Sequence, residues 1–162
     1  MPNDTQVPDV PRLKRMFESI AHCRALGMAV DDVGSGSALM SLPYRDDLVG
    51  NAENGHLHGG AVTSLLDTAG GLATLAEVGT TGAIATLDLR IDYLKPATPG
   101  ETVRAFAECY KATHFVVFVR GMAYHNDRDD PIATCVATYM RKGAYERDER
   151  GRGEDGRGKD GP

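Results

Sequence analysis

Apolar residues recur at two different spacings along this chain, and the spacing separates helices from strands. Over residues 12–27 they recur every three or four positions, which predicts a short amphipathic helix that Gly27 can close. Residues 59–78 are predicted to form a long central helix, which ends before a glycine-rich turn at 79–82. The remaining pattern predicts strands: a pair within 28–44 that turns at 34–36, and single strands over 84–94, 102–112, 115–125 and 131–142. A polar loop over 45–57 separates the strand pair from the long helix.

The two-residue alternation typical of a strand is clearest over residues 84–94. Successive side chains of a strand point to opposite faces of the sheet, so two sets can be assigned. One face is expected to carry Ile84, Thr86, Asp88, Arg90 and Asp92, and the other Ala85, Leu87, Leu89, Ile91 and Tyr93.

The order of the elements predicts an α+β domain. An antiparallel sheet of five or six strands with one apolar face must be covered, and helix 59–78 is the only element long enough to cover it. We therefore expect the sheet to wrap this helix in a domain over residues 28–142. A leader and the short helix occupy 1–27, and a charge-alternating, glycine-rich tail over 143–162 is expected to be disordered.

Composition excludes several classes of protein. The 162 residues carry a formal net charge of -5, and no dense basic cluster is available to follow a nucleic-acid backbone. No run approaches the roughly 18 apolar residues of a membrane span, and the N-terminus lacks the apolar core of a signal peptide. Cys23, Cys109 and Cys135 are widely spaced, as expected of reduced thiols in the core of a cytoplasmic protein.

Asp67 is the only carboxylate on one face of the long helix. The residues that share this face are small: Gly60, Thr63, Ser64, Gly70, Gly71 and Thr74. Because glycine inside a helix costs roughly 0.5–1 kcal/mol relative to alanine, this stripe indicates close approach of another helix, of a ligand, or of both. Solvent exposure of Asp67 is the simpler alternative.

The start of the same helix offers a hydrogen-bond donor. Gly59 leaves an uncovered backbone N–H at the positive end of the helix dipole, where it can stabilise a carbonyl oxygen that becomes negative during acyl transfer. Asp67 would act beside it, by attack or through a water molecule. His58 is either a structural cap or a substrate contact. A metal site made of His56, His58 and Asp67 is a weak alternative, because an H-x-H loop with a distant acid is not a specific pattern.

Two segments resemble the PaaI-like hotdog thioesterases. LHGGAVTSLLDTAGG, at 57–71, resembles that family's helix motif, and ATLDLRIDYLKPA, at 85–97, resembles its following strand. The resemblance implies a hotdog fold, in which Asp67 is the nucleophile or general base and the Gly59 N–H polarises the thioester carbonyl. It also implies a hydroxyl at Thr86, supplied in relatives by the neighbouring subunit, and a homodimer, usually assembled into a homotetramer, with sites at the subunit boundary.

The resemblance also suggests how substrate is held. Relatives often carry an amide residue that matches Ala52 here, so Asn51 fills that role only if the loop bulges by one residue, and Asn54 is adjacent. His58, Gly60 and Ser64 lie beside the matched site. Basic residues are candidates for the coenzyme A phosphates, although each one alone is more simply a solvated strand position: Arg90 and Lys95 first, then Lys111, Arg120 and Arg141.

The expected function is hydrolysis of a medium-chain or aromatic acyl-CoA, with no metal or organic cofactor implied. Two alternatives remain open. A hotdog enoyl-CoA hydratase or dehydratase would pair the helix carboxylate with His58 or His56. A non-catalytic protein would bind acyl-CoA without turning it over.

Overall fold

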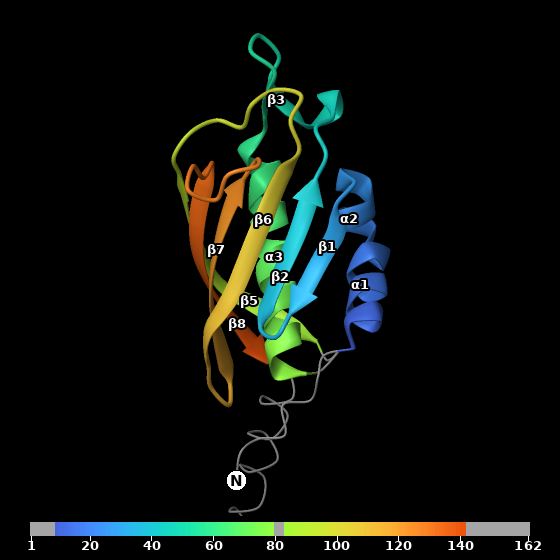
Figure 1. Ribbon diagram of the computed structural model, residues 1–162, viewed down its shortest axis with the longest axis vertical. Helices are drawn as coiled ribbons and strands as arrows, with labels where there is room; N and C mark the ends of the chain where they lie inside the picture. The colour runs from blue at the N-terminus through green and yellow to red at the C-terminus, as the bar shows by residue number, and fades with distance from the viewer. Residues whose placement is uncertain (1–8, 80–82, 142–162) are drawn as a thin grey trace, which may run out of the picture.

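A computed structural model describes residues 9–79 and 83–141 of the chain. The predicted α+β architecture is confirmed: a long helix lies against a six-stranded antiparallel sheet, with two short helices at one side (Figure 1). The helices are α1 (Val10–Ser19), α2 (Ala21–Leu26) and α3 (Gly59–Val78). The sheet strands are β1 (Ala29–Gly34), β2 (Ser37–Leu42), β5 (Ile84–Tyr93), β6 (Val103–Ala112), β7 (Val116–Tyr124) and β8 (Ala133–Arg141).

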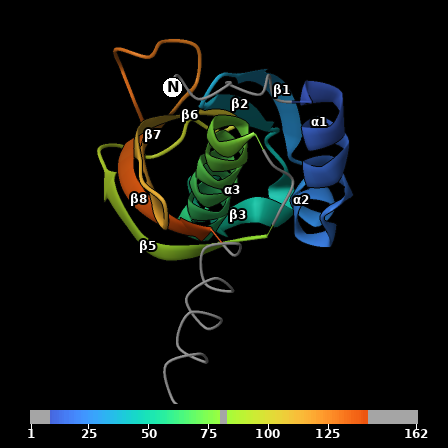
Figure 2. The ribbon, with the colours of Figure 1, turned by 90° about the horizontal axis from the view of Figure 1, so that it is seen from below.

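The sheet curls around α3 in the order β1-β2-β6-β7-β8-β5 (Figure 2). Each neighbouring pair is antiparallel. The two edge strands, β1 and β5, therefore lie on opposite sides of the helix, and α1 and α2 pack beside β1. This hotdog arrangement leaves the outer edge of β5 without a strand partner in the described chain.

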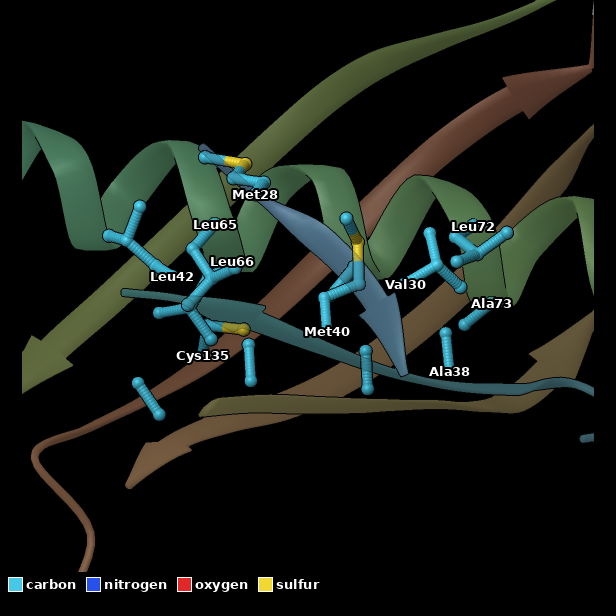
Figure 3. Close-up of a cluster of buried hydrophobic side chains, with 14 of the residues drawn as sticks. Met28, Val30, Ala38, Met40, Leu42, Leu65, Leu66, Leu72, Ala73 and Cys135 are labelled. Atoms are coloured by element: carbon cyan, nitrogen blue, oxygen red, sulfur yellow. The ribbon is translucent and has the colours of Figure 1, made fainter. Parts of the chain in front are cut away.

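The core forms between α3 and the concave face of the sheet. Leu65, Leu66 and Leu72 of α3 are fully buried and meet Met40 and other apolar side chains of the strands (Figure 3). Fully burying a leucine contributes roughly 1.5–3 kcal/mol, so these side chains hold the helix firmly in the sheet. The C-terminal half of α3 is buried nearly all round, since Gly70, Gly71 and Thr74 are buried as well.

The short helix predicted over 12–27 is two helices. The backbone is extended at Ile20 (ψ 125°), which separates α1 from α2. Side chains satisfy the carbonyls at this break, because Arg24 donates to Ser19 O (2.9 Å) and the Ser19 hydroxyl donates to Met16 O (2.8 Å). Gly27 ends α2 in a left-handed conformation (φ 74°), as predicted.

The clean alternation predicted for 84–94 is wrong because β5 contains a bulge. Thr86 pairs with Tyr139 and Asp88 with Thr138, so Leu87 is an extra residue without a partner on β8. The bulge shifts the alternation by one residue. Ile84 and Thr86 consequently face the helix together with Leu89 and Ile91, which the uninterrupted pattern assigns to the opposite face.

The polar loop predicted over 45–57 has local structure of its own. It contains a 3-10 turn at Asp46–Leu48 and a small hairpin of β3 (Val49–Asn51) and β4 (His56–Leu57). Residues 80–82 of the predicted turn, residues 1–8 of the predicted leader and all of the predicted tail lie outside the described residues. In the part of the chain that is described, no helix has the length and apolar character needed to cross a membrane.

Candidate active site

The first turn of α3 is capped by its own N-cap residue. His58 Nδ1 accepts a hydrogen bond from Gly60 N (2.9 Å), and His58 O accepts one from Ala61 N (2.9 Å). Of the two roles open to His58, the geometry supplies the cap. Gly59 is exposed, and its N–H has no acceptor among residues 9–79 and 83–141. This amide is therefore free to donate to a ligand.

Tyr93, at the end of β5, holds this first turn in place. Its hydroxyl donates to Gly59 O (2.7 Å) and lies 2.8 Å from Thr63 Oγ1. A Cβ atom on Gly59 would come within 3.3 Å of the Tyr93 hydroxyl oxygen, which is tight. Glycine at this position therefore lets the strand lie close to the helix. The sequence pattern did not single out Tyr93.

Asp67 lies about two turns further along α3 than Gly59 and is half-buried. Thr86 Oγ1 donates to Asp67 Oδ1 (2.9 Å), and the Tyr139 hydroxyl donates to Asp67 O (2.9 Å) and lies 3.3 Å from Oδ1. Within the described residues, Asp67 Oδ2 makes no hydrogen bond. The resemblance places a hydroxyl such as Thr86 in a neighbouring subunit, whereas here Thr86 reaches Asp67 of its own chain.

The bulge in β5 is what brings Thr86 to Asp67. If the strand paired regularly, without a bulge, the inward set Leu89 and Ile91 would continue to Leu87 and Ala85, and Thr86 would face outward. With the bulge, Ile84 contacts the helix at Gly71, Thr86 at Asp67 and Tyr93 at Gly59. β5 therefore runs antiparallel to α3 and fixes both the carboxylate and the helix start.

A groove of about 400 Å³ opens beside the first turns of α3. Ser64 lines this groove, and its hydroxyl donates to Gly60 O (2.9 Å) and lies 3.2 Å from His22 Nε2 of α2. The lining combines apolar and polar side chains: His22, Leu26, Asp47, Leu48, Val49, His58, Gly60, Ala61 and Ser64. The groove thus adjoins the free Gly59 amide, and α2 forms one wall that the sequence pattern did not assign to the site.

The candidate amides are engaged in the β3–β4 turn. Asn51 Oδ1 accepts from Glu53 N (3.0 Å), and Asn54 Oδ1 accepts from His56 N (3.1 Å). Both are turn-forming contacts that asparagine commonly makes. In this single chain neither amide contacts Asp67.

The two leading basic candidates do not lie beside α3. Arg90 is exposed on the outer face of the sheet, where it pairs with Asp92 (3.0 Å). Lys95 follows β5 and pairs with Asp130. The described geometry therefore places Thr86 beside Asp67. At the start of α3 it gathers a second group of candidates: His58, Gly59, Gly60 and Ser64. Arg90 and Lys95 belong to neither group.

The cysteines lack the character of nucleophiles. Burial raises the pKa of the Cys23 thiol, and it raises the pKa of the Cys135 thiol to about 11. Such thiols remain protonated at neutral pH and pack as small apolar groups. In the described parts of the chain, His, Cys, Asp and Glu nowhere form a group of three that could hold a metal ion.

Comparison with known proteins decides the family. A sequence profile of the thioesterase superfamily matches residues 54–132, which include α3 and β5. The medium/long-chain acyl-CoA thioesterase YigI of Escherichia coli K12 is 32% identical over 130 residues, covering 72% of this chain and 83% of YigI. The chain belongs to the thioesterase superfamily.

Similarity to solved structures confirms the hotdog fold of this superfamily member. A Pseudomonas aeruginosa protein is 42% identical, with a TM-score of 0.74, and the match covers 82% of this chain and 98% of that one. A structure of the phenylacetic acid degradation protein PaaI from Thermus thermophilus is 26% identical, with a TM-score of 0.65 over 74% and 97% of the two chains. The predicted PaaI-like character of this thioesterase is thereby confirmed.

Proposed function

We propose that this thioesterase hydrolyses acyl-CoA thioesters with a medium-length or aromatic acyl group, releasing the free acid and coenzyme A. The observation that carries the proposal is the half-buried Asp67, held by two hydroxyl groups with one carboxylate oxygen left unengaged by the described residues. The name of the related YigI supports acyl-CoA as the substrate class.

The two functional groups of α3 divide the chemistry. The Gly59 N–H donates to the thioester carbonyl oxygen and stabilises the negative charge that develops there. The Asp67 carboxylate either attacks the carbonyl carbon, expelling the coenzyme A thiolate and leaving an anhydride for water to cleave, or removes a proton from an attacking water. Both routes consume one water and yield one acid and one thiol.

One chain does not bring these groups to the same carbonyl for direct attack. Eight residues of helix separate Gly59 from Asp67, which is roughly 12 Å, whereas a hydrogen bond joins atoms about 3 Å apart. When α3 of a second copy packs in the opposite direction, Gly59 of one copy lies beside Asp67 of the other. The active unit proposed here is therefore a homodimer with two shared sites.

The free edge of β5 supports this dimer. Leu87 is 54% exposed and Leu94 is 58% exposed, and the edge is ten residues long. A long unpaired edge strand with exposed leucines favours association with another strand. Antiparallel pairing of β5 with β5 of a second copy would cover this edge and set the two α3 helices side by side. Association of two dimers into a tetramer stays a prediction.

The groove beside α3 supports the assignment of substrate. It adjoins the Gly59 amide, and Leu26, Leu48 and Val49 provide an apolar wall of the kind that an acyl chain or aromatic ring requires. The polar groups of His22 and Ser64 can contact the amides of the pantetheine arm.

A thiol-release assay over acyl-CoAs of graded length and aromaticity tests the proposal. Asp67→Asn is expected to lower kcat by about 100-fold or more, because it removes the nucleophile or base while keeping the side-chain volume. Asp31→Asn is the matched control, since Asp31 is an exposed carboxylate on β1, at the opposite edge of the sheet from β5. Normal turnover by a folded Asp67→Asn variant would overturn the proposal.

Two further measurements separate the alternatives. Loss of enoyl-CoA absorbance without thiol release would indicate a hydratase instead. Binding of acyl-CoA, measured by calorimetry, with no hydrolysis across the whole panel would indicate a binding protein. The cap role of His58 weighs against the hydratase, because its Nδ1 already accepts from Gly60 N.

A further inference from the structure

Tyr139, on the last strand of the sheet, lies directly against the carboxylate to which the proposed function assigns the chemistry. Its hydroxyl donates to Asp67 O (2.9 Å) and lies 3.3 Å from Asp67 Oδ1. We propose that Tyr139 is a positioning residue, which fixes the orientation of the Asp67 side chain and keeps Oδ2 directed away from the sheet. This inference rests on the proposed function of Asp67.

The tyrosine is built into its place. Tyr139 is only 1% exposed, and its ring lies over Gly70, which follows Asp67 by about one turn of the helix. A Cβ atom on Gly70 would lie 2.3 Å from the hydroxyl oxygen, so that only glycine accommodates it. Close packing around the ring therefore opposes movement of the hydroxyl away from the carboxylate.

The tyrosine is also fixed as a donor. Burial raises its pKa, and the negative charge of Asp67 raises it further. The hydroxyl thus keeps its proton throughout the range in which an enzyme of this kind works. It is therefore a neutral hydrogen-bond donor beside the half-buried carboxylate and adds no charge to the site.

Thr86 and Tyr139 act on the same oxygen. Both hydroxyls lie within 3.3 Å of Asp67 Oδ1, one from β5 and one from β8. Because the terminal torsion of an aspartate is broad, a carboxylate held at a single point can rotate. Thr86 donates to Oδ1, while the single Tyr139 O–H is shared between the Asp67 backbone oxygen at 2.9 Å and Oδ1 at 3.3 Å. Contacts from two strands thus hold Oδ1 and leave Oδ2 for water or substrate.

The test compares Tyr139→Phe with Tyr124→Phe in the full-length protein. Tyr124 is a comparably buried tyrosine on β7, and its hydroxyl accepts from Arg128 Nε (3.1 Å) rather than contacting α3. Tyr139→Phe is expected to lower kcat by about tenfold with little change in KM, because the Asp67 side chain loses the shared contact that orients it. Tyr124→Phe is expected to keep kcat, and both are assayed well below their Tm.

Two additional variants distinguish positioning from a purely structural role. Tyr139→Phe added to Asp67→Asn should cause no further loss of residual activity, because the tyrosine acts through the carboxylate. Tyr139→4-aminophenylalanine restores an N–H donor on the same ring and should recover most of kcat. Equal losses in both backgrounds, or no recovery with a normal Tm, would overturn the positioning role.

The proposed function and this inference fail in different ways. Wild-type kcat for Tyr139→Phe, in an enzyme that Asp67→Asn inactivates, overturns only the role of Tyr139. An active Asp67→Asn variant overturns the proposed function itself.

Discussion

The hydroxyl of Tyr139 occupies the space that a Cβ atom on Gly70 would need, at 2.3 Å from its ideal position. The small residues of α3 therefore serve two purposes. In the C-terminal half, Gly70 and Gly71 admit side chains of the same chain, namely Tyr139 and Ile84. Only the N-terminal part of the stripe, from Gly60 to Asp67, remains accessible to a ligand or a second helix.

Gly70→Ala is expected to destabilise the protein and lower kcat. The new methyl group displaces the Tyr139 hydroxyl from Asp67, and overpacking of a core typically costs about 1–3 kcal/mol, partly offset by the better helix propensity of alanine, about 1 kcal/mol. Urea denaturation and the thiol-release assay measure the two effects.

Gly71→Ala is the matched control for this change. Its Cβ would lie 3.2 Å from Ile84 Cδ1, the far end of a flexible side chain that can move aside. Unfolding free energy and kcat should both stay close to wild type. Equal effects of the two substitutions would contradict the special role of the Gly70–Tyr139 contact.

Most of the fold follows from local sequence, whereas the site depends on distant contacts. Glycine at 79 and the HGG run at 58–60 mark the ends of α3, so that its bounds are predicted as the structure has them. The bulge at Leu87 is set by the register between β5 and β8, which no local pattern in residues 84–94 reveals. Its consequence, an inward Thr86, is therefore not predictable from alternation.

Tyr139 is a second residue of the site that the local sequence pattern does not identify. It lies 72 residues from Asp67 in the sequence, and a strand pattern assigns it only to a face of the sheet. The signal that pointed to it is the pair of glycines at 70–71, because such a pair inside a helix requires a close neighbour. The sequence shows that something must lie there but does not identify which side chain it is.

Stability at high pH should report the buried hydroxyl. Burial raises the pKa of Tyr139 in the folded state, whereas an unfolded tyrosine titrates near pH 10. Above about pH 10 the unfolded chain binds fewer protons than the folded one, so unfolding becomes easier by about 1.4 kcal/mol per pH unit for this group. Below that pH its contribution is fully present.

The comparison that isolates this effect is between wild type and Tyr139→Phe. The difference in unfolding free energy, measured by urea denaturation from pH 8 to 11, should be constant up to about pH 10 and then shrink as wild type alone loses the contribution. Titration of other groups, including Cys135, cancels because both proteins share it. A difference that is constant to pH 11 would show that Tyr139 is not held in a buried, proton-retaining site.

Leu87→Lys should disrupt the proposed dimer. A lysine on an exposed strand edge opposes pairing with another strand, and Leu87 lies in the bulge of β5. Light scattering should show monomers, and kcat should fall because Gly59 and Asp67 of different copies no longer meet. Val136→Lys, which changes an exposed residue on the outer face of the sheet, should keep the dimer and its activity. Active Leu87→Lys monomers would contradict a shared site.

His58 offers a means of separating a structural cap from a contact with substrate. Its Nδ1 accepts from Gly60 N, so His58→Ala removes an N-cap and is expected to cost about 0.5–2 kcal/mol of unfolding free energy. Asparagine is a preferred N-cap residue, and His58→Asn should therefore restore stability in urea denaturation. If capping is the whole role, His58→Asn also retains wild-type kcat and KM, because the first turn still presents the Gly59 amide. A stable His58→Asn variant with an increased KM would instead show that the imidazole contacts the substrate in the groove that it lines.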